Sequence, residues 1–120
     1  FTMSKRVLAL DEIMQAVAPV LRSYNITEAK VFGSYAKGCA TPYSDVDIYV
    51  DSGLRGLSFF GLLEEIVCAL PIPVDLVDKY TLIPGGELHT EIMKTGIDIS
   101  MPDVHDVKAS QVELNTKQDV

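Results

Sequence analysis

The stretch from Gly33 to Asp51, GSYAKGCATPYSDVDIYVD, decides how the rest of this chain can be interpreted. It joins a Gly-Ser turn to two aspartates, Asp45 and Asp47, which lie two residues apart in an otherwise apolar segment. On a strand, residues with this spacing point to the same face of the sheet. Aspartate is depleted in strands, and two like charges on one face repel each other. The pair therefore predicts a site for a divalent cation that prefers oxygen ligands, such as Mg²⁺.

The Gly-Ser turn that precedes this pair is suited to a phosphate group. Gly33 permits a tight bend and lets an anion approach backbone N–H groups, and the hydroxyl of Ser34 can donate to the same anion. We expect residues 35–37 to begin a helix whose first N–H groups also point at the anion. Lys37 can add positive charge, although a solvated surface lysine is an equal alternative. Ser44 can orient the first aspartate by a hydrogen bond or serve only as a turn residue.

A third candidate carboxylate lies in a later apolar segment, PIPVDLV. Asp75 is flanked there by Val74 and Leu76, so its side chain is expected on the opposite face of the strand from theirs. That face is shared with the first two aspartates if the two strands are neighbours. Asp75 could then help to hold the catalytic metal and to deprotonate an acceptor hydroxyl. Asp78 is a rival for this role, but it falls at the end of the strand and on the other face, so we favour Asp75.

The hydrophobic pattern predicts a small α/β (α+β) domain with a mixed sheet and helices packed on one face. A helix is expected from Val7 to Tyr24, with a kink or a division at Pro19. A second helix is expected to start at a Ser58 cap, to direct Phe59, Leu62, Leu63, Ile66 and Val67 inward, and to end near Leu70. The other expected elements are strands at Glu28–Phe32, Val46–Val50, Val74–Val77 and Ile97–Ser100, and a helix at Glu87–Lys94 that closes at Gly96.

The length of 120 residues predicts a single domain over residues 1–120, with its core at about residues 8–99. Residues 100–120 are polar and are interpreted as a C-terminal tail or a partner-binding arm. Phe1 and Thr2 precede Met3, which we expect to be the natural start. No apolar run approaches the roughly eighteen residues that a membrane span needs, and no secretion signal is visible. We therefore expect a cytoplasmic protein without a membrane partner.

The formal net charge of −7 disfavours binding to long nucleic acid, because few cations are available to neutralise a phosphate backbone. A mononucleotide that arrives with Mg²⁺ remains compatible with this charge. Cys39 and Cys68 are interpreted as ordinary thiols of a reducing compartment, and no zinc motif is present. His89 and His105 are isolated and are expected at the surface or at a partner contact rather than as catalytic bases.

At these residues the chain resembles the minimal nucleotidyltransferases of the DNA polymerase β superfamily. Their pattern is a hydrophobic residue, Gly-Ser or Gly-Gly, a spacer, acidic-x-acidic, and a third acidic residue on a later strand. Phe32-Gly33-Ser34, a ten-residue spacer, Asp45-Val46-Asp47 and Asp75 match it here. The fuller pattern GSYAKG…SDVDIYV is similar to the antitoxin branch, the MNT proteins encoded beside HEPN-domain toxins. The similarity covers about residues 8–99. Such proteins often carry Arg where Lys37 stands, and Lys keeps the charge but loses bidentate geometry.

The resemblance implies a polymerase-beta-like nucleotidyltransferase fold, ATP as substrate and two Mg²⁺ ions. Asp45 and Asp47 would bridge the metals, Asp75 would complete the shell of the catalytic metal, and Gly33, Ser34, Lys37 and Ser44 would lie on the nucleotide side. AMP would pass to a hydroxyl of a tyrosine on a cognate HEPN toxin, and pyrophosphate would leave.

Two alternatives stay open at the level of the sequence. One is a non-catalytic antitoxin or binding module, and the other is a small-molecule nucleotidyltransferase that borrows an acceptor pocket from another subunit. A chain of this size is expected to lack a second domain that could form such a pocket, so the acceptor would come from a partner. A homo-oligomer, in which a neighbouring copy supplies the acceptor, also stays open.

Overall fold

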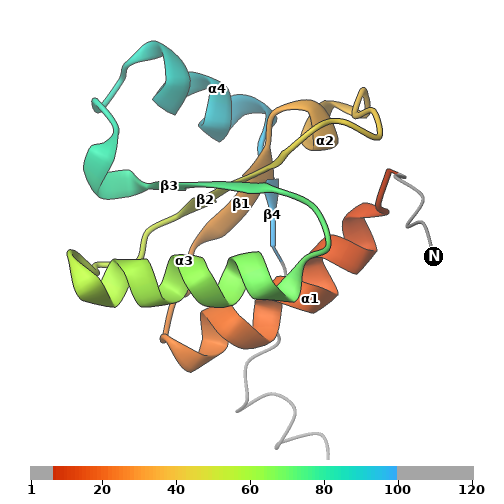
Figure 1. Cartoon of the computed structure of the whole chain (residues 1–120). Coiled ribbons are helices and arrows are strands. Elements are labelled where there is room, and N and C mark those ends of the chain that lie inside the picture. The colour runs from red at the N-terminus through yellow and green to blue at the C-terminus, as the bar shows by residue number, and fades with distance from the viewer. Residues whose placement is uncertain (1–6, 100–120) are drawn as a thin grey trace, which may run out of the picture.

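The computed structural model of this protein describes residues 7–99, and the expected tail and His105 lie outside that range. Helices and strands alternate along the chain (Figure 1). In order they are α1 (Leu10–Ser23), β1 (Ala29–Phe32), α2 (Ser34–Lys37), β2 (Val46–Val50), α3 (Leu57–Ala69), β3 (Val74–Asp78), the 3₁₀ turn η1 (Lys79–Thr81), α4 (Glu87–Thr95) and β4 (Ile97–Asp98). Every helix and strand that the sequence predicts is present, with boundaries that differ by a few residues.

The strands form one mixed sheet in the order β3-β2-β1-β4. β1 is antiparallel to both β2 and β4, whereas β2 and β3 are parallel. A parallel pair needs a crossover connection, and α3 supplies it between β2 and β3. The expected mixed α/β architecture is therefore confirmed.

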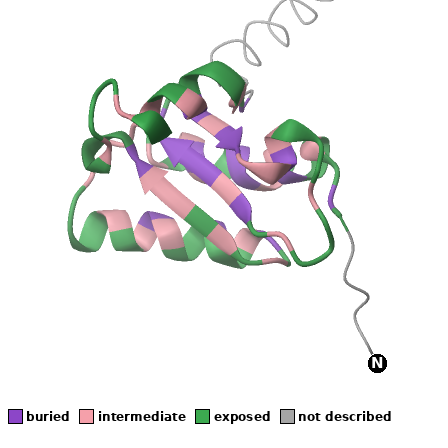
Figure 2. Cartoon of the chain, turned by 90° about the horizontal axis from the view of Figure 1, so that it is seen from above, coloured by how far each residue is buried: buried purple, intermediate pink, exposed green. Residues whose placement is uncertain are grey.

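The main core lies between the sheet and the two long helices α1 and α3, which run beneath it in Figure 1. The alternation in β2 sends every second residue into this core, as the sequence pattern predicts. The fully buried members of this core are Ile13, Val17, Leu21, Val31, Val46, Ile48, Val50, Leu62 and Ile66. Seen from above, buried residues concentrate in the central strands (Figure 2). This packing fixes β2 firmly, and β2 carries the aspartate pair.

The opposite face of the sheet is covered in part by α4. Phe32, Tyr49 and Ile92 form a second, smaller buried cluster there, and Figure 1 shows α4 across the sheet from α1 and α3. The expectation that all helices pack on one face therefore holds for α1 and α3 only. Two large aromatic side chains on the second face have to be kept from water, and Ile92 of α4 provides that cover.

Three local expectations need correction. α1 is not divided at Pro19, since the helix runs from Leu10 to Ser23 with this exposed proline inside it, while the alternative of a kink stays a prediction. Ser58 does not cap α3. The helix begins at Leu57, so Ser58 lies inside its first turn, and Gly56 with a positive φ of 62° makes the turn into the helix. Val67 is 43% exposed rather than inward. In residues 7–99, α3 included, no helix is long and apolar enough to cross a membrane.

Candidate active site

Two of the three predicted carboxylates lie side by side on neighbouring strands. Asp47 of β2 stands opposite Asp75 of β3 in the parallel register, and residues opposite each other share one face of the sheet. Asp45 immediately precedes β2 and is exposed. Asp75 is exposed as well, whereas Asp47 is half-buried. The face that carries these groups is the one on which Tyr49 meets α4.

The charges of the other two carboxylates act on Asp47. The pKa of Asp47 is raised to about 6, first by burial and then by the negative charges of Asp75 and Asp45. This carboxyl is therefore costly to ionise in the protein alone. A bound cation would reverse the sign of that effect, since a positive charge favours the ionised form.

The Gly-Ser turn lies directly against this carboxylate. Gly33 has φ 74° and ψ −149°, a conformation that side-chain-bearing residues rarely adopt. A Cβ atom at Gly33 would also collide with Oδ2 of Asp47. The register explains the proximity, because Phe32, the residue before Gly33, pairs with Asp47. Both the turn and the aspartate therefore require glycine at this position.

The short helix α2 follows the turn, as the sequence predicts. The N–H of Lys37 donates to the Gly33 carbonyl at 3.0 Å, and Gly38 ends the helix with φ 75°. Tyr35 is buried, and its hydroxyl accepts a hydrogen bond from the N–H of Leu8 at 3.3 Å. This contact anchors α2 to the segment before α1, while Ser34 stays partly accessible beside Gly33.

Ser44 and Lys37 have partners that the sequence did not specify. The hydroxyl of Ser44 accepts from the N–H of Thr41 at 2.8 Å, and the N–H of Ser44 donates to the Thr41 carbonyl at 2.9 Å. Ser44 thus serves the turn, which is the second of its two expected roles. Lys37 forms an ion pair with Glu91 of α4, with Nζ and Oε2 2.8 Å apart. Nothing in the sequence pattern pointed to Glu91, because the pairing depends on how α4 folds back over the sheet.

Asp78, the rival third carboxylate, has a different environment. It is 4% exposed and accepts three hydrogen bonds. Ser52 donates to Oδ1 from its N–H at 3.0 Å and from its hydroxyl at 2.6 Å, and the N–H of Tyr80 donates to Oδ2 at 2.8 Å. Asp78 therefore ties the ends of β2 and β3 together. Asp75, by contrast, shares a face with Asp47, and it stays our predicted third member of the site.

The donor set fits Mg²⁺ only in part. Within residues 7–99, no three carboxylate, imidazole or thiol groups are arranged as a complete metal cage. Magnesium is commonly held by one or two carboxylates together with substrate phosphates rather than by an all-protein cage. Asp47 with its carboxylate neighbours supplies the protein share of such a site, and the Gly33 turn is where phosphate oxygens would complete it.

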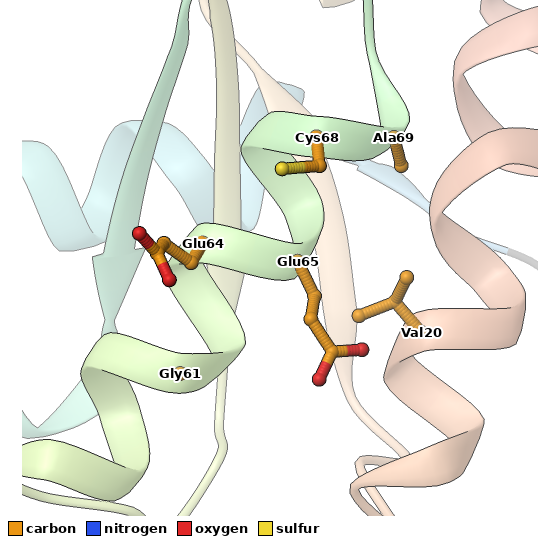
Figure 3. A pocket seen from close by; sticks show the side chains of 6 residues that line it. All are labelled: Val20, Gly61, Glu64, Glu65, Cys68 and Ala69. Carbon is orange, nitrogen blue, oxygen red and sulfur yellow. The ribbon is translucent and has the colours of Figure 1, made fainter.

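One histidine contact and one cavity among the described residues involve none of these site residues. Nδ1 of His89 accepts from the N–H of Gly85 at 3.1 Å, which is a local turn contact. A cavity of about 480 Å³ lies between α1 and α3 (Figure 3). These helices cover the face of the sheet opposite to the one that carries Asp47 and Asp75. It is lined by Val20, Gly61, Glu64, Glu65, Cys68 and Ala69. We do not assign the reaction to this cavity, because neither the Gly-Ser turn nor the carboxylate pair lines it.

Comparison with known proteins finds relatives over the part of the chain that contains the turn and the three carboxylates. The model of the polymerase beta nucleotidyltransferase family matches residues 15–104. The protein adenylyltransferase MntA of Thermococcus cleftensis is 42% identical over 79 residues, which cover 63% of this chain and 80% of that protein. A Methanocaldococcus jannaschii protein, named as a candidate protein adenylyltransferase, is 29% identical over 93 residues, covering 75% of this chain and 97% of that protein.

Solved structures share the fold. A chain of a toxin–antitoxin crystal structure with AMP-PNP superposes with a TM-score of 0.63 at 23% identity, over 88% of this chain and 87% of that one. A chain from the complex of a tri-AMPylated Shewanella oneidensis HEPN toxin with its MNT antitoxin gives 0.58 at 20% identity, over 91% and 90%. The family match spans most of the sequence, so this chain belongs to the polymerase beta nucleotidyltransferase family and is an adenylyltransferase enzyme.

Proposed function

We propose that this chain is a Mg²⁺-dependent protein adenylyltransferase that moves AMP from ATP to a tyrosine hydroxyl of a cognate HEPN toxin, and so acts as its antitoxin. The observation that carries the proposal is the register of Asp47 against Asp75 beside the Gly33 turn. The relationship to the MntA adenylyltransferase supports the reaction class. The AMP-PNP complex and the tri-AMPylated HEPN toxin among the structural neighbours support the nucleotide and the acceptor.

Each proposed residue has a defined role. Gly33 and Ser34 receive the triphosphate, Lys37 adds positive charge at its edge, and Ser44 shapes the loop before the first aspartate. Two Mg²⁺ ions held by the three carboxylates would neutralise the charge that develops on the phosphates. Asp75 accepts the proton of the acceptor hydroxyl. The hydroxyl oxygen then bonds to the α-phosphorus, and the bond from that phosphorus to the pyrophosphate oxygen breaks.

The openness of the site supports a protein acceptor. Asp45 and Asp75 are both exposed, and neither the cavity between α1 and α3 nor the one beside Arg55 and Tyr80 is lined by the carboxylate pair or the turn. A small acceptor would gain little binding energy on such a surface, because small ligands are usually held in concave pockets. A macromolecule can instead bind around the site and present one hydroxyl to it. We place this encounter in the cytoplasm, together with the toxin.

The deciding experiment measures the mass of the toxin after the reaction. The protein is incubated with ATP, Mg²⁺ and the toxin encoded by the adjacent gene, and the toxin is then analysed by intact-mass spectrometry. We expect the toxin to gain one or more AMP units, and to gain none with Asp45→Asn or with EDTA. Glu64→Gln is the matched control, since it removes an exposed carboxylate on the other side of the sheet.

Other outcomes separate the alternatives. A toxin that is bound and neutralised but never modified would support a non-catalytic binding module. Transfer of AMP to small hydroxyl compounds, but not to the toxin, would support a small-molecule enzyme.

A further inference from the structure

The ion pair between α2 and α4 lies at the edge of the proposed nucleotide site. Lys37 is the last residue of α2, and its backbone N–H donates to the Gly33 carbonyl at 3.0 Å. The residue therefore lies one helical turn from the Gly-Ser turn. Nζ of Lys37 nevertheless contacts Oε2 of Glu91 at 2.8 Å. The cation that follows the turn, at the end of α2, is thus engaged by a carboxylate from a helix far away in the sequence.

Glu91 is held in place by its neighbour in α4. Ile92 is fully buried and packs against Phe32 and Tyr49 on the sheet. The position of Glu91 is therefore fixed by the core of this face rather than by the ion pair alone. Its carboxylate contacts Lys37, and this contact helps to keep Lys37 charged by raising the pKa of the ammonium group.

We propose that Glu91 is a positioning residue of the nucleotide site, which restrains Lys37 in the free enzyme and must release it to the triphosphate. This inference rests on the proposed function and deepens it. A carboxylate that holds the cation neutralises the charge that would otherwise attract phosphate. ATP binding therefore includes the breaking of one ion pair, and Glu91 lowers the affinity for ATP through Lys37.

The exposure of the pair sets the size of the effect. The side chains of Lys37 and Glu91 are 46% and 40% exposed, and ion pairs this accessible to water are weak enough to exchange partners. We expect Glu91→Gln to tighten binding of the nucleotide by about two- to five-fold, the scale of exposed pairs. Lys37→Gln should weaken binding by a similar factor. In the Lys37→Gln background, Glu91→Gln should have almost no effect, because no cation remains to be released.

The test measures the dissociation constant of AMP-PNP with Mg²⁺ by calorimetry on the full chain, so that transfer to an acceptor plays no part. Glu87→Gln is the control, because it removes an exposed carboxylate one turn earlier on α4. It should leave the affinity unchanged. Melting temperatures of the free variants report any loss of structure separately, and a merely structural pair would change those temperatures without changing affinity.

Each result has a clear consequence. Weaker binding in Glu91→Gln, or a gain of equal size with and without Lys37, would overturn the inference. If the parent binds AMP-PNP and none of the variants differs from it, the inference fails while the proposed function stands. If the parent binds no nucleotide at all, both fail.

Discussion

Two aspartates on β3 show how the same residue type can serve different purposes three positions apart. Asp78 is buried and accepts three hydrogen bonds from Ser52 and Tyr80. Asp75 is exposed, faces Asp47 across the ladder, and helps to raise its pKa. The first carboxylate is satisfied by the protein itself. The second is set against another negative charge, an arrangement that a protein maintains at a cost in stability unless a ligand offsets it.

The largest effect is expected at the end of the ladder that carries Asp75. Asp75→Asn should lower the rate of AMP transfer by about two orders of magnitude, the usual scale for a positioned acid or base. AMP-PNP affinity should change little, because the Gly33 turn remains. Single-turnover assays with the toxin would measure this. Unchanged turnover would remove Asp75 from the reaction and erase the contrast with Asp78.

A substitution of Asp78, at the opposite end of the ladder, should lower the stability of the protein. Asp78→Ala leaves the donors of Ser52 and Tyr80 without their acceptor, which should lower the free energy of unfolding by about 3 kcal/mol. Urea denaturation would measure the loss. Asp98→Ala, which removes an exposed partner of Lys30, should cost at most about 1 kcal/mol. If the two variants were equally stable, Asp78 would not be the structural tie that its hydrogen bonds indicate.

Gly33→Ala tests the contact between the turn and the carboxylate pair. The positive φ alone should cost about 1–2 kcal/mol, and the added methyl group would displace Asp47. Gly53→Ala is the matched control, since Gly53 has φ 72° and open space around it. Both variants should lose stability, but only Gly33→Ala should lose binding of AMP-PNP with Mg²⁺. Equal loss of binding in both would mean that the turn does not hold the nucleotide.

The smallest effect concerns pH. Folding raises the pKa of Asp47 from 3.8 to about 6, so the native state favours the protonated carboxyl. Its contribution to stability is complete below pH about 4 and is lost as the pH rises through about 6. Asp47→Asn stays uncharged throughout. Its melting temperature without metal should therefore exceed that of the parent by a few degrees at most near pH 7, and the difference should vanish near pH 4. A difference independent of pH would argue against this origin.

Local patterns predicted much of this structure. Residues close in sequence determine the alternation in β2 and the Gly-Ser turn. Strand parity determines that the Asp75 side chain lies on the other face of β3 from those of Val74 and Leu76. The sequence alone also favoured Asp75 over Asp78, and that choice stays a prediction. The structure adds that Asp78 is buried and hydrogen-bonded, whereas Asp75 is exposed.

Long-range contacts could not be predicted in the same way. The position of α4 depends on how Ile92 covers Phe32 and Tyr49, and the partner of Lys37 follows from that packing. The sequence pattern did not predict the start of α3. Serine is a preferred N-cap residue, which favoured Ser58, but the helix starts after Gly56, whose positive φ makes the turn. Hydrogen bonding of Ser44 to Thr41 rather than to the aspartate likewise became visible only in three dimensions.

The order of the strands gives Asp75 a second consequence. β3 is an edge of the sheet in the described part of the chain, and an open edge can pair with a strand of another molecule and begin aggregation. The charge of Asp75 near the start of that edge strand, with Pro73 just before the strand, discourages such pairing. The carboxylate proposed for chemistry thereby also protects the solubility of the protein. A neutral substitution there would remove both properties together.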